Sequence, residues 1–93
     1  MSDVEDILNE REKTHGSYLD QSFITNALKQ VVLDYAKAQL PYFAKEAVDM
    51  ILVKLGRILT GNPNEKDHWD DIAGYSTLVS KEITKQQNPD RID

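Results

Sequence analysis

The four residues 61–64, Gly-Asn-Pro-Asn, join two segments with helical patterning, and this short connection constrains the fold more than any other feature. Glycine is common at the C-terminal end of a helix, and proline often follows it because proline cannot continue the helix. The sequence therefore predicts one helix from about Pro41 to Thr60 and another from residues 65–67 to about Lys85. Because the connection is so short, we expect the two helices to be antiparallel neighbours.

Helical patterning extends over the rest of the chain, and the two-residue alternation typical of strands is absent. Ser2 and Glu5 match a capping box, which predicts a short first helix that ends near Gly16. A second helix is expected from residue 21 or 22 to Leu40. The predicted helix that follows Pro41 is apolar on more than one side, which is typical of a central helix.

These elements predict an all-α fold, a small up-down helical bundle of three long helices plus a short N-terminal one. We expect a single domain over residues 1–85 and a flexible polar tail over residues 86–93. The second helix has apolar residues on adjacent faces. One of those faces is either buried in the monomer or packed against a partner subunit. In the second case, the protein is a homo-oligomer.

Composition excludes several classes of protein. A net charge of -5 and a pI near 4.9 argue against nucleic acid as a partner and against an anionic membrane surface. The chain has no cysteine, so a disulfide or a thiolate metal site is excluded. The N-terminus does not resemble a signal peptide, and no apolar run is long enough to span a bilayer. A cytoplasmic location is expected.

Glycines inside two predicted helices call for an explanation, because each costs about 1 kcal/mol relative to alanine. Counting back from the connection, we expect Gly56 to lie near Trp69 and to make room for its indole in the core. Gly74 is expected to allow the close approach of another helix. The alternative interpretation is that one of these glycines leaves space for a flat ligand.

Acidic residues on the two long helices have two interpretations. Glu46 and Asp49 lie one turn apart, and the next helix opens with Asp67, Asp70 and Asp71. Carboxylates at such spacings can share a divalent cation that binds phosphates, which predicts a metal site for a nucleotide. The alternative is structural. Antiparallel counting places the later aspartates opposite Lys54 and Arg57, the geometry of salt bridges between helices.

His15 and His68 are the only imidazoles, and without cysteine they do not predict a zinc site. His15 belongs to a polar turn. If this turn folds over the junction of the last two helices, it completes a small polar pocket; otherwise it is a surface turn. The predicted ligand-binding residues are Lys54, Arg57, His68, Trp69, Asp71 and His15.

The run Asp67-His68-Trp69-Asp70-Asp71-Ile72-Ala73-Gly74-Tyr75 has the form D-x-W-x-D-I-A-G-Y. Together with residues such as Thr14-His15-Gly16 and Glu46 to Asp49, it resembles a family of small uncharacterised proteins of tailed bacteriophages and prophages. The resemblance covers roughly residues 5–80. It implies expression in the cytoplasm of an infected bacterial host, and it implies no established activity.

A second resemblance is to the all-α nucleotide pyrophosphohydrolases, the MazG-like enzymes. Glu46 and Asp49 are similar to the E-x-x-D half of their magnesium site, whereas the E-E-x-x-E half is absent from this sequence. This resemblance implies Mg²⁺ as a cofactor and Glu46, Asp49 and Asp71 as catalytic and metal-binding residues; otherwise no cofactor is expected.

The sequence is therefore compatible with three functions. The first is a phage-type accessory protein that acts by stoichiometric binding of a host protein or a nucleotide-like small molecule. The second is the metal-dependent nucleoside triphosphate pyrophosphohydrolase. The third is a purely structural interaction protein, in which the motif serves only the fold.

Overall fold

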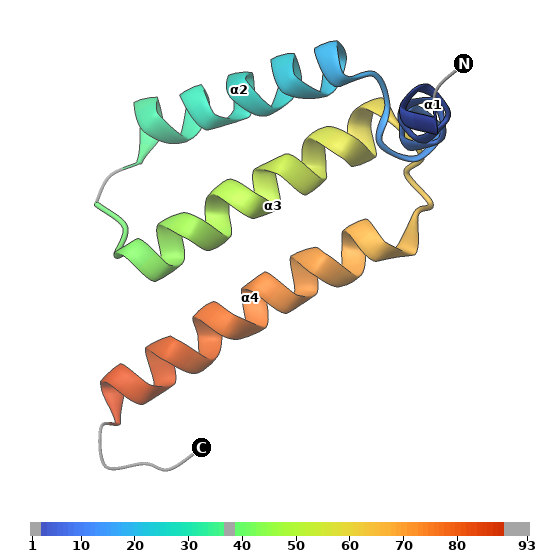
Figure 1. The fold of residues 1–93 in the computed structure, drawn as a ribbon. Helices are drawn as coiled ribbons and strands as arrows, with labels where there is room; N and C mark the ends of the chain where they lie inside the picture. Colours follow the sequence, from blue (N-terminus) through green and yellow to red (C-terminus); the bar gives the residue numbers. More distant parts are fainter. Residues whose placement is uncertain (1–2, 37–38, 89–93) are drawn as a thin grey trace.

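The protein is described here by a computed structural model, which covers residues 3–36 and 39–88. These residues form α1 (Asp3–His15), α2 (Tyr18–Tyr35), α3 (Tyr42–Thr60) and α4 (Lys66–Gln87), with no strand among them (Figure 1). The all-α prediction is confirmed. None of the four helices combines the length and the apolar character that a membrane span requires. Ser2 of the expected capping box and residues 89–93 of the expected tail lie outside the described ranges.

The three long helices run up and down in one layer, with α3 in the middle, α2 along one side and α4 along the other (Figure 1). Within the described residues, no Cα atom of α2 lies within 8 Å of a Cα atom of α4. The short α1 crosses the end of the layer where α3 ends and α4 begins. The central position expected for α3 is confirmed. The apolar side chains that become buried all belong to it: Ala47, Leu52 and Ile58.

α2 starts earlier and ends earlier than the sequence pattern indicates. Its first residue is Tyr18, because the Ser17 side chain accepts a hydrogen bond of 3.1 Å from the Asp20 N–H and so caps the helix. Its last residue is Tyr35, and Leu40 is not helical. Leu40 precedes a proline, and that position disfavours the helical conformation.

The predicted connection between α3 and α4 is confirmed, and the two helices are antiparallel neighbours (Figure 1). The Gly61 N–H donates to the Arg57 carbonyl at 2.8 Å and closes α3. α4 continues to Gln87, two residues beyond the expected end at Lys85.

Both interior glycines lie in surroundings that differ from the prediction. Gly56 is buried against α2, where an added Cβ would overlap the Thr25 hydroxyl. It therefore does not lie against Trp69, whose own position is half exposed. Gly74 has open space around it, with no atom within 4 Å of an added Cβ. The expectation that Gly74 allows a close helix approach is wrong for the described chain, because α4 packs on α3 with a different side.

Candidate functional site

The turn between α1 and α2 lies directly on the turn between α3 and α4. The Asn62 N–H donates to the Thr14 carbonyl at 2.9 Å, and the Thr60 hydroxyl lies 3.1 Å from the His15 carbonyl. The sequence left open whether the His15 turn folds over this junction, and the structure shows that it does. Side chains from all four helices therefore meet at one end of the molecule.

Two glycines make this crossing possible. Gly16 has φ of 80°, a conformation that residues with a Cβ rarely adopt, and an added Cβ there would overlap the Thr60 carbonyl. An added Cβ on Gly61 would overlap the backbone of residues 14–16. Each glycine therefore allows the other backbone to approach.

A pair of histidines joins α1 to α4 at this crossing. His15 Nδ1 lies 3.2 Å from His68 Nε2, and the two ring centres are 4.9 Å apart. His68 is 2% exposed. The hydrogen bond requires one ring nitrogen without a proton, so both rings cannot be charged while it persists. Burial, followed by the positive charges of Arg57 and the His68 ring, lowers the pKa of His15 below 6.5.

An ion pair links α3 to α4 beside the histidines. Lys54 Nζ lies 2.7 Å from an Asp71 carboxylate oxygen, and the Lys54 side chain is 12% exposed. The hydrogen bond from Lys54, followed by its charge, lowers the pKa of Asp71. This is the inter-helix salt bridge that antiparallel counting predicts. Asp70 instead pairs with Lys66, one turn earlier on its own helix, at 2.6 Å.

Arg57 lies at the same end and forms no ion pair within 4 Å among the described residues. Burial is the largest cause that lowers the pKa of Arg57, and the positive charge of Arg11 lowers it further. The negative charge of Asp71 raises it. Two guanidinium groups therefore lie close enough to repel each other. A negatively charged ligand would relieve this repulsion.

The two arginines line a cavity of about 520 Å³ between α1, the start of α2 and the end of α3. A volume of a few hundred Å³ is typical of small-molecule sites, whose range is about 300–1,000 Å³. Its other lining residues are Glu5, Leu8, Asn9, Glu12, His15, Gly16, Tyr18 and Gln21. The cavity is thus a candidate binding site whose walls carry charges of both signs, apolar surface and hydrogen-bonding groups.

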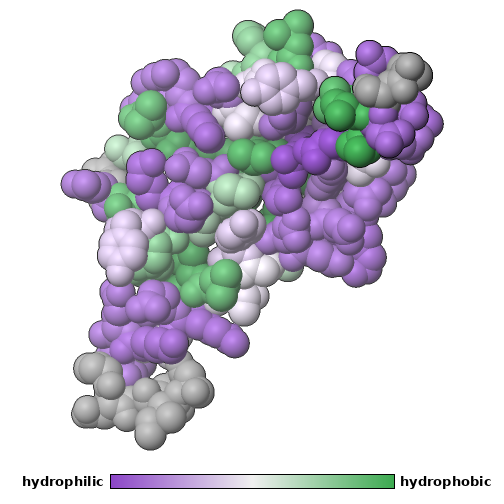
Figure 2. All heavy atoms as spheres, viewed as in Figure 1, coloured by the Kyte–Doolittle hydropathy of each residue, from purple (hydrophilic) through white to green (hydrophobic). Residues whose placement is uncertain are grey.

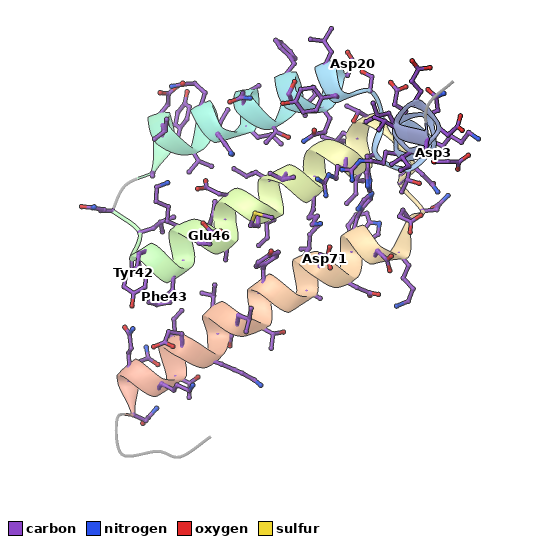
Figure 3. The ribbon with its side chains drawn as sticks, viewed as in Figure 1. Asp3, Asp20, Tyr42, Phe43, Glu46 and Asp71 are labelled. Carbon is purple, nitrogen blue, oxygen red and sulfur yellow. The ribbon has the colours of Figure 1, made fainter. Side chains whose placement is uncertain are left out.

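The carboxylates proposed for a shared cation are not brought together. Glu46 lies on the α4 side of α3, in a cavity with Tyr75 and Glu82, whereas Asp49 bonds Lys45 at 3.2 Å. Asp71 lies farther along the layer (Figure 3) and pairs with Lys54. Within residues 3–36 and 39–88, no three histidine or acidic side chains converge on a point that could hold a metal ion.

Trp69 is not in the core, contrary to the expectation from sequence. It is 50% exposed, and its indole N–H donates to the Pro63 carbonyl at 2.8 Å. The side chain therefore braces the connection between α3 and α4 from outside. It does not line the cavity that contains Arg57.

Sequence reasoning missed Arg11, Tyr18 and Gln21 as cavity residues. A signal was available for Arg11, because it precedes His15 by four residues on one helix and therefore shares its face. No comparable signal existed for Tyr18 and Gln21, since α2 was expected to begin only after most of this segment.

Residues 1–83 match the family model described as "Domain of unknown function (DUF6378)", and the chain therefore belongs to this family. No curated protein and no solved structure matches the chain.

Proposed function

We propose that this member of the DUF6378 family acts by stoichiometric binding of a small anionic ligand of the nucleotide type. The site is the cavity between α1, α2 and α3. One observation carries the proposal: Arg57 is partly buried, faces the charge of Arg11, and has no carboxylate within ion-pair distance in the described chain. A phosphate or carboxylate group would accept hydrogen bonds from both guanidinium groups and screen their repulsion.

Apart from the carboxylates Glu5 and Glu12, the remaining walls suit the rest of a nucleotide. Tyr18, whose ring is largely exposed, and Leu8 offer apolar surface on which a base can stack. Asn9 and Gln21 add polar groups for hydroxyl and amide hydrogen bonds. His15 also lines the cavity, and its lowered pKa favours the neutral ring, which can donate or accept a hydrogen bond without adding charge.

The setting we propose is that of a phage-type accessory protein in the cytoplasm of an infected bacterium. The D-x-W-x-D-I-A-G-Y run at residues 67–75 supports it by resemblance. Host-protein binding and a purely structural role are alternatives. They explain the exposed apolar side chains of this chain, but they give no reason for two adjacent guanidinium groups in one cavity.

The metal-dependent pyrophosphohydrolase is a different hypothesis, which would use Mg²⁺ with Glu46, Asp49 and Asp71. No observation on the described residues favours it, since Asp49 and Asp71 each pair with a lysine. Incubation with Mg²⁺ and nucleoside triphosphates, followed by a pyrophosphate assay, tests this hypothesis separately from binding.

Thermal unfolding in the presence of nucleoside mono-, di- and triphosphates tests the binding proposal. A ligand at 100 times its Kd stabilises the folded state by about 2.7 kcal/mol. We expect at least one nucleotide to raise Tm. In Arg57→Gln and Arg11→Gln, which remove one cation each, the shift should fall to a small fraction of its wild-type size.

Lys13→Gln is the matched control. Lys13 lies on α1 close to Arg11, pairs with Glu10 at 3.0 Å, and does not line the cavity, so its removal should leave the shift unchanged. The proposal is wrong if no nucleotide shifts Tm at millimolar concentration, or if Arg57→Gln and Lys13→Gln respond alike.

A further inference from the structure

The open layer leaves an apolar surface that the described helices cover only in part. On α2, Ile24, Leu28, Val31 and Tyr35 follow one another three or four residues apart and form one stripe. Val31 is 55% exposed and Tyr35 is 78% exposed. A stripe of this kind normally packs on another element. In the described part of the chain, Ile24 and Leu28 are partly buried, whereas Val31 and Tyr35 stay exposed.

α3 continues this surface. Ile51 and Leu55 are only partly buried, although they lie on the central helix. At about 100° per residue, they project from the side opposite Val53 and Arg57. The charged residues of α3 all project elsewhere: Lys45, Glu46, Asp49, Lys54 and Arg57. An arc of about a third of the helix circumference therefore has no charge.

The two stripes emerge on the same face of the layer. Thr25 and Gly56 mark the sides on which α2 and α3 meet. Each stripe is rotated from that contact in the same direction, by about a quarter turn on α2 and about a third of a turn on α3. Because antiparallel neighbours are related by an approximate two-fold axis perpendicular to the layer, similar rotations lead to one face. We call Ile24, Leu28, Val31, Tyr35, Ile51 and Leu55 the apolar face.

The surface area of the chain is what a missing partner would predict. The accessible surface is 7160 Å² for 10.6 kDa, whereas a folded monomer of that mass exposes about 5,500 Å². Nine residues lie outside the described ranges. If their full unfolded-chain area is subtracted from the accessible surface, and their mass from the mass of the reference monomer, an excess of about 600 Å² remains. A standard interface buries about 800 Å² on each partner.

We propose that a second copy of this chain covers the apolar face and that the protein is a symmetric dimer. A two-fold interface brings a patch against itself, so the patch must be self-complementary. An uncharged face meets this condition even though each copy has a net charge of -5, because no like charges have to be buried. Two three-helix layers packed face to face would then share one core. The cavity with Arg57 lies on the opposite side and stays accessible.

Sedimentation equilibrium of the full chain from about 1 to 100 µM tests the dimer. We expect a mass of two copies in the upper part of this range. Val31→Glu places a charge on the apolar face and should weaken the association at least tenfold. Tyr35→Ser, which removes a ring without adding a charge, should weaken it in the same direction. Far-UV circular dichroism checks that both variants keep their helices.

Leu33→Glu is the matched control, because Leu33 is on the same helix and is 72% exposed, but it projects from the other face. Its mass should stay that of two copies. A wild-type mass of one copy across the range overturns the proposal and leaves the face for a different protein. Association that survives both Val31→Glu and Tyr35→Ser, or that Leu33→Glu weakens equally, also overturns it.

Discussion

Gly56 and Gly74 have the same intrinsic cost in a helix, and their surroundings give them opposite roles. Gly56 is buried where α3 meets α2, with the Gln21 carbonyl 3.3 Å from an added Cβ and the Thr25 hydroxyl closer still. Gly74 faces open space. The sequence shows only that both positions are helical. Which of the two is required for packing depends on the neighbouring helix.

Alanine substitution at each glycine should therefore change stability in opposite directions. Gly74→Ala should stabilise the protein by about 0.5–1 kcal/mol, because alanine loses less backbone entropy on folding. Gly56→Ala should destabilise it by about 1–3 kcal/mol, because the added methyl forces α2 away from α3. Urea unfolding followed by circular dichroism measures both. Equal effects of the two substitutions would contradict the packing described for Gly56.

Individual hydrophobic side chains are exposed at several places on the surface of the layer. Figure 2 shows hydrophobic side chains at the surface among hydrophilic ones on the visible face. Tyr18, Leu33 and Leu78 are more than half exposed. An isolated exposed apolar residue is ordinary in proteins. The apolar face is different because its members are contiguous on two neighbouring helices.

At the scale of helices, the feature that holds the four helices together at one end is the crossing of two turns. The α1–α2 turn and the α3–α4 turn hold each other through the Asn62–Thr14 hydrogen bond and the His15–His68 pair. Helix ends that would otherwise fray are thereby fixed. The same crossing places Arg11 of α1 beside Arg57 of α3. The cavity therefore depends on the crossing.

Mild acid should loosen this crossing. The pKa of His15 is lowered in the folded state from its ordinary value of 6.5, so the unfolded chain binds the proton more readily. The stability from a neutral His15 is then fully present above about pH 6.5 and is lost as pH falls from there towards the folded pKa. Urea midpoints measured at half-unit intervals from pH 7.5 to about 5 should decrease below pH 6.5.

His15→Gln removes the titrating group and should flatten that decrease. Carboxylates titrate mainly below this window, so they do not mask the difference. A wild-type midpoint that is constant between pH 7.5 and 5 would contradict the role of the His15–His68 pair.

The whole molecule is unusually extended for its length. Its radius of gyration is 16.4 Å, whereas a compact domain of this length has about 12 Å. Few side chains become buried, and the buried polar residues Thr25 and His68 account for part of them. A chain that buries so little apolar surface gains little stability alone. Association would supply the missing burial.

Thermal stability should therefore depend on protein concentration. Because the dimer dissociates on unfolding, a tenfold rise in concentration should raise Tm by about 3–6 °C. Differential scanning calorimetry over a hundredfold range measures this slope. Val31→Glu should have a lower Tm than the wild type at each concentration. A wild-type Tm that is constant across the range would contradict association through the apolar face.

The sequence by itself determined the helices and the short connection between α3 and α4. Apolar spacing, Gly61 and Pro63 are local signals, and helices depend largely on local hydrogen bonds. The same signals gave the antiparallel pairing and, with it, the Lys54–Asp71 ion pair. They were less accurate at the ends of α2, where one capping side chain, that of Ser17, decides the boundary.

Only the tertiary structure decided how residues distant in sequence meet. The overlap of two turns brings Arg11 and Arg57 to one cavity. Helical periodicity fixes the face on which a side chain lies, but it does not fix which element covers that face. For the described residues, the single layer around α3 settles that question, because it leaves Val31 and Tyr35 of the apolar face exposed.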